Sequence, residues 1–180
     1  FNEGVVTVHQ SINDGVVPDL DVASNLMLDH LTDKKSGFFV SEKNLRIESE
    51  KIAEIMGLSF DSKKPVSELG VADRQLIAIA RAMARNPKVL ILDEPTSSLS
   101  AKEADRLFKL LDRLRSTNVA ILYISHRMSD IRQIADKIIC MRDGSISGTF
   151  DEKPLDYEGA VTAMIGHKMT EVNFKISEKG

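Results

Sequence analysis

Cysteine is almost absent from this sequence, and Cys140 is the single example among 180 residues. It lies within the apolar run Ile138–Met141, where we expect the thiol to pack in the interior as a small apolar group. A packing thiol favours a reducing compartment and argues against a catalytic cysteine. Histidine is also scarce, and three of the four residues lie in no metal-binding pattern: His9, His30 and His167.

Long apolar runs and an excess of positive charge are missing as well. No stretch approaches the roughly 20 apolar residues that a membrane-spanning helix needs, and no signal peptide is recognisable. The net charge of −3 provides no broad basic face to neutralise phosphates, which argues against a general nucleic-acid binder. With 42% hydrophobic and 28% charged residues, the chain has the composition of one globular domain with a substantial core.

The strongest local pattern is the octapeptide Val89–Thr96, an apolar run that ends in Asp93, Glu94 and Pro95. Its apolar residues predict a buried central strand of a parallel sheet, which the proline terminates. Ligands of open α/β sheets gather beyond the carboxyl ends of the strands. Asp93 suits Mg²⁺ binding there, and Glu94 suits accepting a proton from a water molecule. Taken alone, the octapeptide is equally compatible with two solvated acids that cap a core strand.

A second apolar run, Ala120–Ile124, follows after a loop and a helical segment, and it leads into Ser125, His126 and Arg127. The order of strand, acidic pair, loop, helix, strand and histidine closely resembles the second half of an ATP-binding cassette (ABC) ATPase. The resemblance extends from near the first residue to about the last twenty. A lone histidine is more often structural, but its place after the second strand favours a functional one.

The resemblance implies an α/β fold, namely a partial P-loop NTPase (ABC cassette) fold with a parallel-sheet core, a helical subdomain and a C-terminal β-hairpin. Asp93 would belong to the Walker B motif and bind Mg²⁺. Glu94 would be the catalytic base, and His126 would be the switch histidine that contacts the γ-phosphate of ATP and orients Glu94. We expect ATP and Mg²⁺ as cofactors.

Gln10 ends the β-branched run that begins at Gly4. In the family this position opens the Q-loop, where a glutamine oxygen contacts Mg²⁺ or the attacking water. The resemblance therefore adds Gln10 to the cofactor and metal ligands. Without the later motifs, a surface amide at a strand end would be the default interpretation.

The segment Ser67–Gln75 occupies the place of the family's signature loop, usually Leu-Ser-Gly-Gly-Gln, which opens a helix toward the γ-phosphate held by an opposing cassette. The corresponding residues are Leu69, Gly70, Val71, Ala72 and Asp73. Glycine replaces the serine that would donate to phosphate, and Asp73 adds a negative charge near a polyanion. Asp73 is also a good N-cap or first-turn acid for a helix expected over 74–85.

Ser97–Ser100 matches the family's D-loop, from which we expect Ser98 and Ser100 to contribute to cofactor binding. The family usually has aspartate at the last position. Ser100 can also cap the following helix, with Glu103 as the reciprocal partner of a capping box. We expect the helical segment 101–116 to pack against the core through its apolar residues, with its charged residues facing solvent.

The resemblance implies four parts along the chain. Residues 1–10 form a core strand and the start of the Q-loop, 11–86 a helical subdomain with the signature-like loop, 87–166 the other core half, and 167–180 a linker or tail. The start at Phe1 suggests a piece of a longer protein, and the segment after Gly166 resembles the junction after the first cassette of tandem sugar importers. No Gly-x-x-x-x-Gly-Lys-Ser/Thr occurs, so we expect this piece alone to bind ATP poorly and to be inactive.

The implied function is ATP hydrolysis coupled to import of a sugar or sugar-like solute, at the cytoplasmic face of the membrane. The expected partners are a second cassette, transmembrane permease subunits and, indirectly, a solute-binding protein, with no nucleic acid. An alternative is a regulatory cassette with a degenerate signature that binds ATP without efficient hydrolysis. A DNA-repair or chromosome-maintenance head of the same fold is less compatible, because sustained heptads are absent.

Overall fold

The computed structural model describes residues 4–9, 15–28 and 41–166, which form two compact units. The first unit reaches to His126 and the second begins at Arg127. Gln10, His30 and His167 lie outside the described residues, as does the proposed linker after Gly166. The four-part division expected from the sequence stays a prediction.

The first unit contains a parallel sheet of three strands in the order β1-β2-β3. Their bounds are Val5–Val8, Val89–Asp93 and Ala120–Ile124. Val5 is level with Val89, which in turn is level with Ala120, so the strands run side by side without offset at their starts. The expectation that Val89–Asp93 is the central strand of a parallel sheet is confirmed, and the fold class is α/β.

Alternate residues of this sheet point to opposite faces, as the period of two in a strand requires. One face is fully buried at Leu90 and Leu92, and its Tyr123 packs a tilted ring against Phe108, with 6.3 Å between ring centroids. Phe108 belongs to a helix after β2, so this face is the core side of the sheet.

The other face of the same sheet is largely open among the described residues. Val5, Leu122 and Ile124 are 45%, 50% and 43% exposed there. The sequence predicts burial along the whole of β2, but only every second residue is fully buried. The reason is that the described helices cover one face, whereas parallel sheets are normally covered on both.

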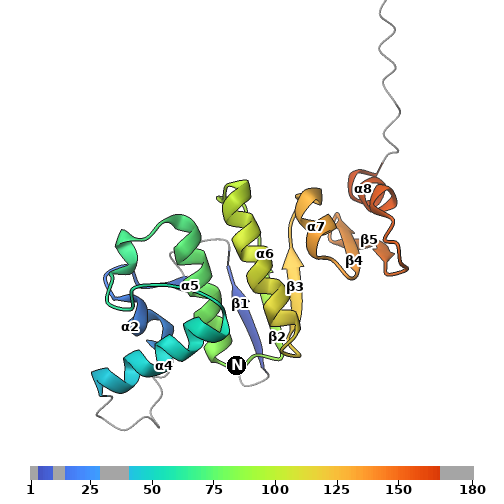
Figure 1. Cartoon of the computed structure of the whole chain (residues 1–180). Helices are drawn as coiled ribbons and strands as arrows, with labels where there is room; N and C mark the ends of the chain where they lie inside the picture. The colour runs from blue at the N-terminus through green and yellow to red at the C-terminus, as the bar shows by residue number, and fades with distance from the viewer. Residues whose placement is uncertain (1–3, 10–14, 29–40, 167–180) are drawn as a thin grey trace, which may run out of the picture. The chain divides into compact units, whose positions relative to one another are not determined.

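Five helical segments lie within the described residues of the first unit, and α5 and α6 lie beside the sheet in Figure 1. The α-helices are α2 (Val22–Leu26), α4 (Glu42–Ile55), α5 (Val71–Ala84) and α6 (Ala101–Arg115), and a 3₁₀ turn spans Val66–Glu68. Their apolar residues recur at helical spacing, as the sequence predicts for α5 and α6. In α6 the expected core positions are all buried: Ala104, Leu107, Phe108, Leu111 and Leu114.

The sequence predicts a helix over 41–56 whose apolar face consists of Leu45, Ile52, Ile55 and Met56, and α4 departs from that expectation. Met56, just beyond its end, is buried, but Ile55 is 70% exposed and Ser49 is the one fully buried residue within the helix. At 100° per residue, Ile55 lies about a third of a turn from the line through Ser49 and Met56. The hydroxyl of Ser49 donates to the carbonyl of Arg46 at 2.8 Å, which satisfies its polar group inside the protein.

The second unit is a β-hairpin that packs on α8. Strand β4 (Ile138–Arg142) pairs antiparallel with β5 (Ser145–Phe150), and helices α7 (Met128–Ile134) and α8 (Tyr157–Ile165) belong to the same unit. Asp143 and Gly144 both have positive φ, at 51° and 75°, as a tight two-residue hairpin turn requires. The predicted C-terminal hairpin is therefore confirmed. The sequence also predicts a final helix over 157–165 that ends at Gly166, and α8 confirms it, with Gly166 in the left-handed conformation.

Cys140 lies in the core of this second unit, where 3% of its surface is exposed. Its neighbours in the core are Ile138, Leu155 and Ala160. The expectation of a buried packing thiol is confirmed. Within the described ranges, no helix has both the length and the apolar character needed to cross a bilayer.

Candidate functional site

The acidic pair lies where the central strand leaves the sheet. Asp93 is the last residue of β2, and Glu94 follows in a left-handed backbone conformation with φ of 48°. The Glu94 N–H donates to the carbonyl of Ile124 at 3.0 Å, and the Ser97 N–H donates to the carbonyl of Glu94 at 3.1 Å. These bonds tie the first turn after β2 to the end of β3. A positive φ is uncommon for a residue with a side chain and clusters at functional sites.

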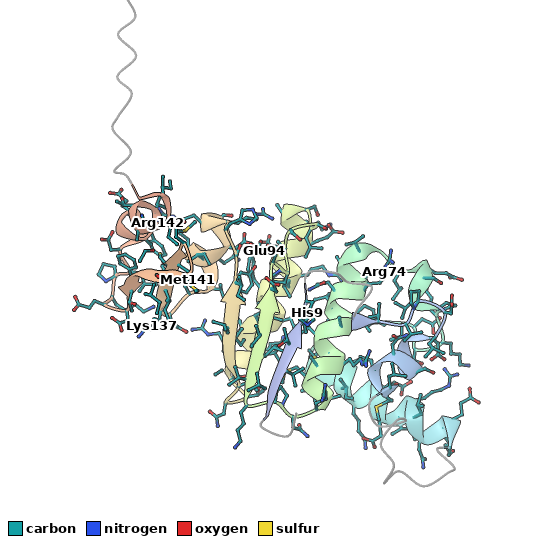
Figure 2. All side chains as sticks on the ribbon, turned by 180° about the vertical axis from the view of Figure 1, so that it is seen from behind. His9, Arg74, Glu94, Lys137, Met141 and Arg142 are labelled. Carbon is teal, nitrogen blue, oxygen red and sulfur yellow. The ribbon has the colours of Figure 1, made fainter. Side chains whose placement is uncertain are left out.

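Glu94 and His126 are brought into direct contact from the ends of neighbouring strands. Oε1 of Glu94 lies 2.7 Å from Nδ1 of the imidazole, and it also accepts the backbone N–H of His126 at 3.1 Å. Figure 2 labels Glu94 at the end of the sheet where β2 finishes. With the carboxylate ionised, Nδ1 must carry the proton, because a carboxylate only accepts hydrogen bonds. Nε2 then remains available for a further partner.

The two oxygens of Glu94 differ in their surroundings. The Glu94 side chain is 16% exposed and that of His126 is 73% exposed. Oε2 of Glu94 is buried and has no hydrogen-bond partner among the described residues. A buried acceptor without a donor costs on the order of 1–3 kcal/mol. This atom is therefore placed to gain a proton or a donor from a bound molecule.

Asp93 provides an oxygen ligand of the type that Mg²⁺ prefers. Its side chain is half-buried and makes no hydrogen bond or ion pair with another described residue. Magnesium is commonly held by one or two carboxylates together with water and phosphate oxygens. A single uncommitted carboxylate at the carboxyl end of the central strand fits that pattern. The described residues hold no cluster of three or more metal-ligating side chains, and Gln10 lies outside them.

The signature-like segment forms the start of α5. Gly70 is the N-cap residue, and the helix begins at Val71, not at 74 as the sequence suggested. Ala72 is buried, whereas Gly70 and Val71 are exposed. Asp73 is consequently an acid of the first turn, and its expected alternative role as the N-cap is wrong. Leu69 takes an extended conformation before the cap and is half-buried.

Helix α5 runs antiparallel to β2, because only a short connection joins them. Its first turn therefore lies at the same end of the unit as the carboxyl ends of the strands, as Figures 1 and 2 both show. Helix α6 begins at that end too, since it follows β2 after a short loop. The acidic pair, the signature-like segment and the D-loop segment thus share one end of the first unit.

Asp73 is paired with a residue to which the sequence assigned no chemistry. Nη2 of Arg106, in α6, lies 2.8 Å from Oδ1 of Asp73. The side chains are 48% and 29% exposed, respectively. Only the charge of Arg106 and its polar position on α6 are visible in the sequence, and neither identifies a partner on another helix.

Ser100 caps α6 as the sequence predicts. The Glu103 carboxylate accepts from the Ser100 backbone N–H at 2.8 Å and from its hydroxyl at 2.6 Å. These hydrogen bonds, the hydroxyl's first, lower the pKa of Glu103, and Arg106 adds a smaller effect of the same sign. Ser98 is exposed in the loop before the cap. Cofactor binding by Ser98 and Ser100 stays a prediction.

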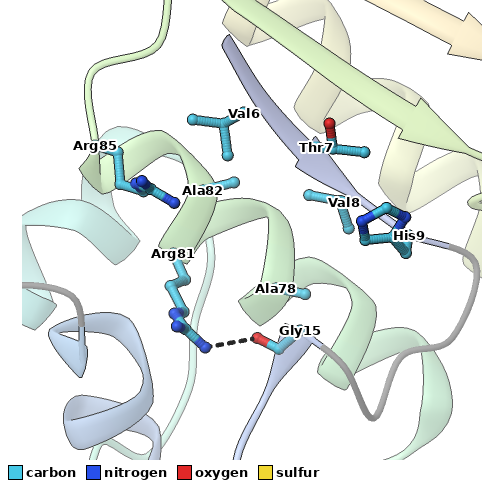
Figure 3. A pocket seen from close by; sticks show the side chains of 9 residues that line it. All are labelled: Val6, Thr7, Val8, His9, Gly15, Ala78, Arg81, Ala82 and Arg85. Carbon is cyan, nitrogen blue, oxygen red and sulfur yellow. Dashed lines mark hydrogen bonds between the residues drawn. The ribbon is translucent and has the colours of Figure 1, made fainter. Parts of the chain in front are cut away.

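A cavity of about 170 Å³ lies between β1 and α5. The Arg81 guanidinium donates to the carbonyl of Gly15 at 3.2 Å across it (Figure 3). None of the predicted site residues that the structure describes lines this cavity, and neither Asp93 nor Glu94 contributes to its lining. Its lining consists of Val6, Thr7, Val8, His9, Gly15, Ala78, Arg81, Ala82 and Arg85.

The sequence model of the family described as ABC transporter matches residues 1–97, more than half of the chain. The chain belongs to the ABC transporter family. The match includes β2, the acidic pair and the signature-like segment, whereas His126 lies beyond it. The contact between Glu94 and His126 is therefore an observation of the structure and is independent of the family match.

Curated ABC relatives with similar sequences are named as sugar-import proteins. The galactose/methyl galactoside import ATP-binding protein of Fusobacterium nucleatum is 39% identical over 95% of this chain and 33% of its own length. The arabinose import ATP-binding protein of Rhizobium meliloti is 36% identical over 96% of this chain and 33% of its own length. The chain therefore spans about a third of the length of the curated relatives it matches.

Solved ABC structures confirm the fold. An ATP-binding cassette of an ABC transporter in its ADP conformation superposes with a TM-score of 0.71 at 22% identity, over 91% of this chain and 69% of that one. A Clostridium perfringens component of an ABC transporter complex gives 0.70 at 21% identity, over 83% of this chain and 57% of that one. The expected partial ABC cassette fold is thus confirmed.

Proposed function

We propose that this chain is the water-activating portion of an ABC ATPase that drives import of a sugar or sugar-like solute. The observation that carries the proposal is the contact of Glu94 with His126, which holds one carboxylate oxygen and leaves the other without a partner. The names of the relatives support the sugar class. Since the chain spans a third of those relatives, ATP hydrolysis would require parts of a longer protein.

In the proposed reaction Glu94 is the general base. The backbone N–H and the ring of His126 hold Oε1, so Oε2 is the oxygen that takes a proton from the attacking water. The fixed Oε1 prevents rotation of the carboxylate about its last bond. Nε2 of His126 can meanwhile contact a phosphate oxygen, which links the position of the base to the presence of the γ-phosphate.

Asp93 and the start of α5 are proposed to bind the nucleotide. Asp93 would hold Mg²⁺, which when bound neutralises charge on the phosphate oxygens. The first turn of α5, capped by Gly70, would present backbone N–H groups to the γ-phosphate of ATP in an opposing cassette. Ser98 and Ser100 would line the interface between the two cassettes. Gln10 stays a proposed Mg²⁺ or water ligand on sequence grounds.

The partners follow from this function. We expect a second cassette, within the same polypeptide, to complete the ATP sandwich, and transmembrane permease subunits to receive the motion. A solute-binding protein would deliver the sugar without contacting this chain. The protein would then lie at the cytoplasmic face of the membrane as a peripheral component.

The direct test is Glu94→Gln in the full-length protein assembled with its permease. The amide cannot accept a proton, so we expect kcat for ATP hydrolysis to fall by about 10²–10⁴-fold while nucleotide binding persists. Glu54→Gln is a matched control, because Glu54 is an exposed glutamate of α4 outside the site. Unchanged hydrolysis in Glu94→Gln would refute the role of Glu94 as the base.

A second candidate is a regulatory cassette that binds ATP without efficient hydrolysis. Gly70 favours it, because glycine lacks the hydroxyl that the family's usual serine offers to phosphate. In that case Glu94→Gln would leave hydrolysis nearly unchanged, and restoring the hydroxyl with Gly70→Ser would increase it. Little effect of Gly70→Ser, together with a large loss in Glu94→Gln, favours the catalytic cassette.

A further inference from the structure

The first turn of α5 carries the negative charge of Asp73, and the sequence alone does not show which residue compensates it. Gly70 caps a helix of 14 residues, whose free N–H groups and dipole favour an anion at this end. Asp73, three positions further on, puts a carboxylate beside that end. An uncompensated carboxylate would repel the phosphate that this turn is proposed to meet.

Arg106 supplies a positive charge at this carboxylate from another helix. The 2.8 Å contact of its Nη2 with Oδ1 of Asp73 joins the first turn of α5 to the second turn of α6. The guanidinium and the carboxylate carry opposite charges, so each offsets the other in the potential that a bound anion meets. Because Asp73 is 29% exposed, part of its charge would otherwise act on molecules bound nearby.

A second carboxylate, on α6 itself, also acts on Arg106. Glu103 lies one helical turn before Arg106 and interacts with it electrostatically. Glu103 is held in turn by the backbone N–H and hydroxyl of Ser100. The direct contact of the guanidinium is with Asp73, while Glu103 binds the end of the D-loop segment through Ser100.

We propose that Arg106 is a positioning residue for the phosphate-facing start of α5, where it cancels the charge of Asp73 and ties this turn to the second turn of α6. The inference rests on the proposed function, because it assumes that a phosphate approaches this turn. It assigns to Arg106 a role that is exerted through Asp73. It also explains how an acid is tolerated at a position that meets a polyanion.

A double-mutant cycle in the full-length, permease-assembled protein tests the proposal through KM and kcat for ATP. Arg106→Ala exposes the charge of Asp73, and we expect KM to rise roughly five- to tenfold with little change in kcat. Asp73→Asn removes the carboxylate together with the contact that holds the exposed guanidinium beside this turn, so KM should stay within about twofold of the wild type. In the Asp73→Asn background, Arg106→Ala should add no further increase, because the guanidinium is no longer held at the first turn of α5.

Two further measurements separate this electrostatic role from simple packing. Raising the salt concentration to about 0.5 M should shrink the Arg106→Ala defect, since exposed charges are screened, whereas a packing defect would persist. Arg106→Lys keeps a charge and should hold KM within about twofold of the wild type. Lys109→Ala, which removes an exposed cation one turn further along α6, is the matched control and should leave KM unchanged.

The outcomes are distinguishable. An unaltered KM in Arg106→Ala, or an equal increase with and without Asp73, would overturn the role of Arg106 while leaving the proposed ATPase intact. If Arg106→Ala does not fold, Arg106→Lys and Asp73→Asn decide instead: a strongly raised KM in either one overturns the proposal. Absence of ATP hydrolysis in the wild-type assembly would reject the proposed function itself.

Discussion

Oε1 of Glu94 contacts His126 at two points. It accepts a hydrogen bond from the backbone N–H of His126 at 3.1 Å, and it lies 2.7 Å from Nδ1 of the same residue's ring. The backbone contact fixes the end of β3 against the turn after β2, and the ring contact fixes the carboxylate. The ring is 73% exposed, so it reaches the carboxylate from the solvent side. Removal of the ring alone therefore separates the two effects.

His126→Ala should retain the backbone bond and lose the ring contact. If His126 only supports the fold, the activity loss should track a loss of stability. If it holds Glu94, as proposed, kcat should fall about a hundredfold with stability nearly unchanged. In a Glu94→Gln background the same substitution should add little, because both residues act through one carboxylate. Additive losses in steady-state ATP hydrolysis would contradict this coupling.

Ser100→Ala should raise the pKa of Glu103 toward its ordinary value of 4.5, because the hydroxyl is the first cause of its depression. In the intact cap, the pKa of Glu103 in the folded protein lies below its pKa in the unfolded chain. The cap therefore stabilises the protein above about pH 4.5 and loses this effect as the pH falls through the lower, folded pKa. A carboxyl-carbon NMR titration measures the shift. An unaltered Glu103 titration in the variant would exclude the capping interaction as the cause.

Asn25→Ala should be among the most destabilising polar substitutions in the first unit. Asn25 is fully buried, accepts the Val17 N–H at 2.7 Å, and donates to the carbonyls of Val17, Leu20 and Asp21. Removing the side chain takes the acceptor from the Val17 N–H and one donor from each of the three carbonyls, so we expect a loss of about 1–3 kcal/mol in the free energy of unfolding by urea.

Asn44→Ala is the matched control for this experiment, since Asn44 is an exposed residue of α4. Its effect should stay within about 0.5 kcal/mol. Equal losses in the two variants would show that the hydrogen bonds of Asn25 do not stabilise the loop before α2.

Cys140 should react slowly with a thiol reagent in the native protein. Burial raises the pKa of its thiol above 9.0, and the Sγ atom lies 3.3 Å from the carbonyl of Ala160, to which it donates. Near pH 8 the reactive thiolate is therefore scarce and shielded. Full labelling should require unfolding by denaturant, as followed by absorbance. Rapid labelling of the folded protein would show that the core of the second unit opens readily.

Much of the local structure could be predicted from short segments. The Asp143-Gly144 turn and the glycine at 166 define the ends of their elements, because each satisfies a backbone geometry within a few residues. Apolar spacing likewise identified the buried positions of α6. Prediction failed for Ile55, since the direction in which a helix buries its surface depends on neighbours outside the helix.

The sequence by itself determined the order of the elements, the acid-bearing strand end and the resemblance to ABC cassettes, because these depend on neighbouring residues. Only the tertiary structure decided that Glu94 and His126, 32 positions apart, share a hydrogen bond, and that Asp73 pairs with Arg106. The physical reason is the same in both cases. The packing of strands and helices determines which side chain lies beside a carboxylate. Separation along the chain does not show which cation or imidazole that will be.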